Sequence, residues 1–265
     1  MPSFRGNVGN LLQHWVLCEL LSACEDRYQR LGFIDAYSIA PFAKDRLKKR
    51  DAGAAVFDAV ATQLPGQLSS YEKAWLSLRT NFQEYPNSAA FVTATWRGRY
   101  ALFLCETDPA TVASLEHWAT IARQVPGCEG VEIAAGDWRK YLRGPSLPSS
   151  DLSFFSLDPY MFDRHGSGKN PGNVDPTDLT RLAEALHDVD GSVVLQLSTY
   201  SANNDNSQEK VRALIKCALK RANLVEAAMV RADGNMMSLV FTRDVDAPTF
   251  STLQSRFNEW IANFR

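Results

Sequence analysis

The 265-residue sequence predicts an α/β protein with a doubly wound, mostly parallel sheet. Short apolar runs alternate with segments of helical spacing along most of the chain, as strands and their connecting helices do. Four of these runs end at or just before an acidic residue, and two later runs flank Asp233-Gly234, a dipeptide typical of hairpin turns. We therefore expect a single domain over residues 1–265, with a seven-stranded sheet that includes an antiparallel C-terminal hairpin.

The apolar patterns predict the following elements in chain order. Strands are predicted at 32–37, 100–105, 131–134, 152–157, 192–197, 224–231 and 236–242. Helices are predicted at 10–30, 108–125, 178–187 and 207–222 and from about 249, and another begins at 138–142. Residues 54–82 have helical spacing without a strand signal, and a short helix follows a turn at 85–89. The segment at about 52–98 is therefore predicted to be a small helical insertion.

The composition is that of an ordinary globular protein, with 45% hydrophobic and 22% charged residues. The formal net charge of −2 lacks the basic excess of a nonspecific nucleic-acid-binding protein. Five scattered cysteines without a CxxC pair indicate reduced thiols in a cytoplasmic protein. The four histidines show no metal-ligand spacing with the cysteines, so no metal is expected. We also expect no signal peptide and no membrane span.

The acidic residues that follow four of the predicted strands are Asp35, Glu106, Asp137 and Asp158. The carboxyl ends of parallel strands lie at one edge of a sheet, so these side chains are expected to meet there. Acids are common in turns, which gives each of them an ordinary structural explanation. A nucleoside-type ligand would explain all four, because carboxylates accept hydrogen bonds from ribose hydroxyls and from an adenine amine. Asp158 would then face the reactive end of the ligand.

Two stretches have both a structural and a functional interpretation. Asp158-Pro159-Tyr160 follows an apolar strand and is either a strand-ending turn or a reaction centre with an aromatic ring beside a carboxylate. The second stretch is basic and is either a solvated face or a phosphate-facing patch at the mouth of the site. The residues of this patch, which would bind a nucleic-acid substrate, are Lys44, Arg46, Lys48, Lys49 and Arg50.

Five short motifs occur along the chain, at residues 6–14, 33–38, 85–88, 104–106 and 158–160. In this order they resemble motifs of the S-adenosylmethionine-dependent N6-adenine methyltransferases of large-subunit ribosomal RNA (the RlmJ type). The first two are similar to that family's Gly-Asn-x-Ala-Asp-Val-Leu-Lys-His and Tyr-x-Asp-Thr-His-Ala. The others are similar to its Tyr-Pro-Gly-Ser, its Glu-containing second-strand motif and its Asp-Pro-Pro-Tyr. The resemblance extends from the N-terminus to about Phe162.

The resemblance implies a Rossmann-like class I methyltransferase fold, S-adenosylmethionine as cofactor and N6-adenine methylation of RNA (or DNA). It implies a catalytic group of Asp158, Pro159 and Tyr160. The cofactor-binding residues that it implies are His14, Asp35, Tyr37, Ser38, Glu106 and Asp137. The expected partner is nucleic acid, and no membrane is involved.

The chain departs from the family in the loop after the first strand. The family has Ala-Gly-x-Gly there, and glycine lets the backbone approach a cofactor closely. This chain has Ser38-Ile39-Ala40-Pro41, and Gln13 replaces the lysine of the opening motif without supplying its charge. The alternative function is therefore a catalytically inactive methyltransferase-fold protein that binds a partner or a different ligand. Residues 158–160 also have a shorter similarity to the Asp-Pro-aromatic-Gly motif of three-Cys-motif partner proteins.

Overall fold

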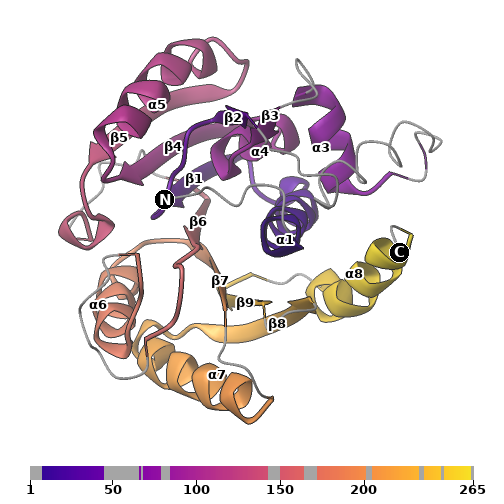
Figure 1. Ribbon diagram of the computed structural model, residues 1–265, viewed down its shortest axis with the longest axis vertical. Coiled ribbons are helices and arrows are strands. Elements are labelled where there is room, and N and C mark those ends of the chain that lie inside the picture. The colour runs from indigo at the N-terminus through magenta and orange to yellow at the C-terminus, as the bar shows by residue number, and fades with distance from the viewer. Residues whose placement is uncertain are drawn as a thin grey trace.

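The computed structural model describes residues 8–44, 66, 68–78, 84–142, 150–163, 172–200, 205–232, 236–245 and 248–263. Its centre is a seven-stranded sheet with the order β5-β4-β1-β6-β7-β9-β8 (Figure 1). These strands are β1 (Arg30–Asp35), β4 (Arg99–Glu106), β5 (Cys128–Ala135), β6 (Leu152–Leu157), β7 (Ser192–Tyr200), β8 (Val225–Ala232) and β9 (Met236–Arg243). Within this sheet β9 pairs antiparallel with β7 and β8, and the other pairs are parallel. The predicted fold class and C-terminal hairpin are confirmed.

The strands of the sheet centre are buried on both faces. On β1, Leu31 and Phe33 belong to one hydrophobic core, whereas Ile34 belongs to the other. Successive side chains of a strand point to opposite faces, so each strand contributes to both cores. A strand covered on both faces favours apolar or small residues at nearly every position, which is why the buried positions of β6 are filled by Leu, Phe and Ser.

Helices cover both faces of the sheet. The face that carries Leu31 and Phe33, called the α1 face, packs against α1 (Val8–Glu25), α3 (Ser70–Leu78), α4 (Ser88–Thr95), α5 (Pro109–Ala122) and α8 (Leu253–Ala262). The face that carries Ile34, called the α6 face, packs against α6 (Pro176–His187) and α7 (Asp205–Leu219). Figure 1 shows α6 and α7 side by side, on the other side of the sheet from α1 and α8.

Polar side chains determine where three of the helices begin. Asp108 accepts a hydrogen bond from the Thr111 amide at 2.8 Å, and proline occupies the first turn of α5. Asp175 and Asp178 form a reciprocal capping box at the start of α6. Asn87 caps α4 by accepting from the Ala90 amide at 2.8 Å. Each cap satisfies an amide that would otherwise lack a helical partner.

The predicted insertion at about 52–98 contains a strand besides helices, and this strand pairs with another that precedes the insertion. β2 (Phe42–Lys44) and β3 (Glu84–Pro86) form a two-stranded antiparallel sheet, which is not predicted because three residues are too few to show a period. The helix expected to begin at 138–142 is a single 3₁₀ turn, η2 (Trp138–Lys140). Two other 3₁₀ segments, η3 (Lys220–Ala222) and η4 (Pro248–Thr252), adjoin α7 and α8. The predicted helix at 54–65 lies outside the described residues.

None of the helices in the described part of the chain has both the length and the apolarity that a membrane crossing requires. All five cysteines are free thiols, and Cys18, Cys24 and Cys105 are buried. Across the ranges that the structure describes, no group of three His, Cys, Asp or Glu residues is placed to hold a metal ion.

Candidate functional site

The four predicted acids lie at one edge of the sheet. Their strands, β5, β4, β1 and β6, are consecutive in the sheet order, so the acids follow one another as Asp137, Glu106, Asp35 and Asp158. Asp35 is the last residue of β1 and is in register with Leu104 of β4 and Ser156 of β6. The parallel topology therefore brings together carboxylates that are far apart in the sequence.

Asp35 and Asp158 are the acids whose ionisation the fold perturbs most. The Asp35 side chain is buried, and burial together with the charge of Glu106 raises its pKa to about 6. Its Oδ1 accepts a hydrogen bond from the Tyr37 amide at 3.2 Å, which favours the ionised form. Burial, with the negative charge of Asp35, raises the pKa of Asp158 to about 7. Two carboxyls on neighbouring strands thus titrate near neutral pH.

Glu106 and Asp137 make hydrogen bonds within their own turns. Oε1 of Glu106 accepts from the backbone amides of Thr107 at 2.5 Å and Asp108 at 2.8 Å. Asp137 caps η2 by accepting from the Arg139 amide at 3.0 Å. It also forms an ion pair with the guanidinium of Arg139, at 2.9 Å. Both acids therefore shape the start of the connection that follows their strand.

Arg139 is a site residue that the sequence reasoning does not single out. Its guanidinium joins Asp137 at 2.9 Å to Asp178 of α6 at 2.8 Å, and it also donates to the backbone oxygen of Asn173. It lies over the ring of Trp138, 5.2 Å from the ring centroid. Arg139 thus connects the turn after β5 to the start of α6. The acid-x-Arg spacing after a strand is a signal that could have drawn attention to it.

Pro159 and Tyr160 continue directly from Asp158. Pro159 is buried, whereas the Tyr160 side chain is 65% exposed. The Tyr160 amide donates to the backbone oxygen of Gly172 at 2.8 Å, and Phe162 forms a parallel bridge with Val174. These contacts fix the backbone that carries the exposed ring. An aromatic ring next to a perturbed carboxyl is therefore accessible from solvent.

His14 lies inside the core, on α1. The side chain is 1% exposed, and burial lowers its pKa to about 3, so it is neutral. Its Nδ1 is 3.0 Å from the Tyr85 hydroxyl and its Nε2 is 3.2 Å from the Ser88 hydroxyl. Gln13 reaches the same Ser88 hydroxyl at 3.5 Å. The opening motif and the Tyr-Pro-Asn-Ser motif, about 70 residues apart in sequence, are thus in direct contact.

The loop after β1, called the post-β1 loop, consists of Ser38-Ile39-Ala40-Pro41. None of its residues has a positive φ, so this backbone path does not require glycine. The hydroxyls of Tyr37 and Ser38 are buried, and neither meets the full geometry of a hydrogen bond within the described chain, although Trp138 lies near the first and Asp35 near the second. Buried polar groups usually have hydrogen-bond partners, so a polar ligand at this edge would supply partners for these hydroxyls. In this respect the residues fit a cofactor that presents hydroxyl, amine and carboxylate groups.

The basic patch cannot be placed as a unit. Lys44 ends β2, and its backbone pairs with Glu84 of β3. The other four residues of the predicted patch, 46 and 48–50, lie outside the described residues. The role of this patch in nucleic-acid binding stays a prediction.

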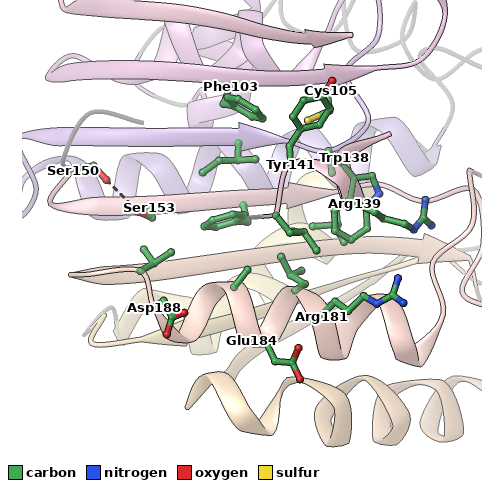
Figure 2. A pocket seen from close by; sticks show the side chains of 18 of the residues that line it. Phe103, Cys105, Trp138, Arg139, Tyr141, Ser150, Ser153, Arg181, Glu184 and Asp188 are labelled. Atoms are coloured by element: carbon green, nitrogen blue, oxygen red, sulfur yellow. Dashed lines mark hydrogen bonds between the residues drawn. The ribbon is translucent and has the colours of Figure 1, made fainter. Parts of the chain in front are cut away.

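A cavity of about 1310 Å³ lies on the α6 face. Ile34, Phe103 and Phe155 line it from the strands, and α6 borders its opposite side (Figure 2). Asp35 directly follows Ile34, so its side chain points to the α1 face instead. None of the four acids lines the cavity, but Ala36, Cys105 and Leu157, each next to one of the acids in the sequence, do, so the cavity adjoins the acidic edge from the α6 face. Residues 143–149, which connect two of its lining residues, lie outside the described residues.

No family model and no curated protein matches the chain. Among solved structures, the chain is similar to protein LPL1258 from Legionella pneumophila, of family model DUF519, with TM-score 0.61 and 15% identity over 98% of this chain and 93% of that chain. A SAM-dependent methyltransferase from Aquifex aeolicus matches with TM-score 0.37 and 12% identity over 58% and 75%. Aeropyrum pernix fibrillarin in complex with natively bound S-adenosyl-L-methionine matches with TM-score 0.36 and 15% identity over 58% and 60%.

The strand order defines the class of fold, and the likeness to LPL1258 supports it. The chain has a Rossmann-like α/β fold, with a mostly parallel sheet and an antiparallel C-terminal hairpin. Ligands of open α/β sheets bind outside the carboxyl ends of the strands. In this chain that edge carries the four acids.

Proposed function

We propose that this protein is an S-adenosylmethionine-dependent methyltransferase acting on the N6 amine of adenine in RNA, with DNA as the less favoured substrate. The observation that carries the proposal is Asp158-Pro159-Tyr160 at the carboxyl end of β6, beside Asp35 on the adjacent strand. A carboxylate next to an exposed aromatic ring suits a planar base that carries an amine. A cytoplasmic location accords with five free thiols.

The cofactor would supply an electrophilic methyl group on a positively charged sulfonium. We assign its binding to the acidic edge, through Asp35, Tyr37, Ser38, Glu106 and Asp137. The hydroxyls of Tyr37 and Ser38, which lack a complete hydrogen bond within the described chain, support this assignment, since a polar ligand would supply one. Oε1 of Glu106 is bonded to its own turn, which leaves Oε2 as the acceptor for a ribose hydroxyl.

Within this proposal His14 acts from the core. Both of its ring nitrogens are within hydrogen-bonding distance of protein hydroxyls, so it holds Tyr85 and Ser88 in place instead of contacting a ligand itself. Its contribution is to hold α1 against the start of α4.

The reacting base would be oriented by residues 158–160. The ionised Asp158 carboxylate accepts a hydrogen bond from the adenine amine, and the exposed Tyr160 ring stacks on the base. Pro159 fixes the turn between these two contacts. Correct orientation of the nitrogen toward the methyl group accounts for much of the rate in such a transfer. The basic residues Lys44, Arg46, Lys48, Lys49 and Arg50 would contact substrate phosphates.

A second candidate is a catalytically inactive methyltransferase-fold protein that binds a partner or another ligand. The observation in its favour is that Asp137 already has a cationic partner, Arg139, at 2.9 Å. The post-β1 loop also carries Ile39 and Pro41 where the resembling family has glycine. An acid engaged in an ion pair is less available to a ligand amine, and bulky residues restrict close approach to the backbone.

Calorimetric titration with S-adenosylhomocysteine distinguishes the two functions. The methyltransferase proposal predicts saturable binding by the wild-type protein. No detectable heat at millimolar ligand would contradict it and favour the inactive alternative. Transfer of a labelled methyl group to an unmodified ribosomal RNA transcript, compared with DNA of the same sequence, then tests the substrate.

Replacing Asp158 tests the proposed reaction centre. Asp158→Ala is expected to lower methyl transfer by about 10²–10⁴-fold, because the amine loses its acceptor, while cofactor affinity stays within about twofold. Asp26→Ala is the matched control, since Asp26 is exposed and precedes β1, at the opposite edge of the sheet. Loss of cofactor binding together with activity would show that Asp158 serves the cofactor and not the base.

A further inference from the structure

The post-β1 loop is the part of the acidic edge that the sequence leaves without glycine. It begins three residues after Asp35 and ends immediately before β2. The Ser38 amide donates to the backbone oxygen of Cys105 on β4 at 2.9 Å, which ties the start of the loop to the main sheet. The end of the loop continues into β2, where Phe42 pairs with Pro86 of β3. The middle of the loop therefore depends on other contacts for its position.

Those contacts come from one residue of the insertion, Asn87. Its side-chain Nδ2 donates to the backbone oxygen of Ile39 at 2.7 Å. Its backbone amide donates to the backbone oxygen of Pro41 at 2.9 Å. Its Oδ1 accepts from the Ala90 amide at 2.8 Å, which caps α4. Asn87 is fully buried, so water does not compete for these bonds.

The two ends of the Asn87 amide therefore perform separate tasks. The oxygen stabilises the first turn of α4, as in any capped helix. The nitrogen holds the loop, and only an amide of this length can do both at once. The loop carbonyls at 39 and 41 are drawn toward α4, and the loop is fixed beside Asp35 without a glycine in it.

We propose that Asn87 is a positioning residue for the cofactor: it clamps the post-β1 loop to the start of α4, in the place where a glycine-containing loop would approach the ligand by itself. The inference rests on the proposed function, since it concerns the same site. Through Asn87 the helical insertion positions the proposed cofactor-binding loop by a contact from outside the main sheet. A preformed loop binds its ligand without the entropic cost of ordering.

The experiment distinguishes the hydrogen bond that Asn87 donates to the post-β1 loop from the one that it accepts as the N-cap of α4. Asn87→Asp keeps the cap oxygen and the size of the side chain, and at pH 8 the ionised carboxylate has no proton to donate to Ile39. Asn87→Ser keeps a good N-cap but is too short to reach the loop. Thr93→Ala is the control, because it removes a hydrogen bond from Thr93 to the Ala90 oxygen within α4 without touching the loop. Binding of S-adenosylhomocysteine and hydrogen–deuterium exchange of the peptide spanning 36–42 are measured for each protein.

The clamp predicts that both Asn87 variants bind S-adenosylhomocysteine about 10-fold more weakly, the effect of one lost hydrogen bond. Exchange of the 36–42 peptide should rise in both variants, even without ligand, and stay at the wild-type level in Thr93→Ala. If the wild-type protein binds S-adenosylhomocysteine but the Asn87 variants keep its affinity or its loop exchange, the inference is overturned and the proposed function stands. No binding by the wild-type protein overturns the proposed function, and the inference with it. Asn87→Ser supplies the test if the Asp variant does not fold.

Discussion

At the scale of single residues, Asp35 and Asp158 form the most unusual arrangement in the molecule. Burial is the main cause that raises their pKa values, to about 6 and about 7, and the charge of Asp35 adds to the rise at Asp158. A folded-state pKa above the unfolded value means that the native protein binds these protons more tightly than the unfolded chain does. The stability that these groups contribute therefore falls as the pH rises from about 4 to about 7. Ionised acids that weaken a fold are typical of functional sites.

The raised pKa of Asp158 predicts the pH dependence of methyl transfer. The ionised Asp158 carboxylate is a stronger acceptor for the adenine amine than the protonated carboxyl, so kcat/KM should rise with pH and level off above about 7. Asp35→Asn should move the midpoint to lower pH, because the Asp35 charge is one cause of the high pKa at Asp158. Rates between pH 5.5 and 8.5, at saturating cofactor, provide the measurement. An unchanged midpoint in the variant would show that the two carboxyls do not interact.

His14 illustrates what residue-level reasoning can and cannot find. A resemblance between motifs gives it a ligand-binding role, yet it is buried and its polar neighbours are protein hydroxyls. Leu17, Cys18 and Leu21 follow it at helical spacing and are all buried, so the sequence itself places His14 on a core-facing side of α1. Its hydroxyl partners on the insertion could not be predicted, because they depend on how that segment folds back over α1.

At the scale of elements, Arg139 joins the connections that follow β5 and β6, two strands that β4 and β1 separate in the sheet. It pairs with Asp137 of the turn after β5 and with Asp178 in the first turn of α6, where both side chains of the Arg139–Asp178 pair are largely buried. Partly buried ion pairs are weak evidence for net stability, but removal of one partner leaves the other uncompensated. Arg139 thereby fixes the position of η2 relative to the loop that follows Asp158.

A double-mutant cycle on this pair tests the link. Arg139→Ala is expected to lower the free energy of unfolding by about 2 kcal/mol, because it leaves two carboxylates without their cation. Combined with Asp178→Asn, the loss should be smaller than the sum of the two single losses. Urea denaturation gives the values, and Arg181→Ala on the exposed side of α6 is the control. Strictly additive losses would mean that the ion pair does not couple the two elements.

The site was predictable to the extent that it depends on strand ends. Parallel pairing converts four acids that each follow an apolar run into one edge, and no three-dimensional detail is needed for that step. Arg139 and Asn87 are different, since each acts between elements that are distant in sequence. Asn87 has the appearance of an ordinary turn residue beside proline, and its contact with Ile39 exists only because β3 pairs with β2.

At the scale of the whole molecule, aromatic packing joins α8 to the insertion and to α1. Trp260 stacks on Trp15 with ring centroids 5.9 Å apart and meets Tyr71 edge-on at 5.6 Å. Arg256 of the same helix forms an ion pair with the buried Glu19 of α1. The fold class was predictable because apolar periods persist over whole elements. The packing of α8, the insertion and α1 on the α1 face was not predictable, because no local sequence pattern relates these three segments.

Truncation of the central aromatic residue measures how much that closure contributes. Trp260→Ala should lower the free energy of unfolding by about 3–5 kcal/mol, since it opens a cavity among buried rings. The measurement is equilibrium denaturation in urea, with Glu259→Ala, an exposed neighbour on α8, as the control. A loss equal to that of the control would place α8 outside the cooperative core.

The burial of α1 has a consequence for synthesis on the ribosome. Residues 11–21 of α1 are all buried, which an amphipathic surface helix would not show. The partners of this helix include β8, β9 and α8, and Val225, where β8 begins, lies 200 residues beyond Glu25, where α1 ends. At translation speeds of about 5–20 residues per second, α1 waits roughly 10–40 s for those partners to be made. During that interval its apolar surface stays uncovered, and α1 is among the last helices of the described domain to be enclosed.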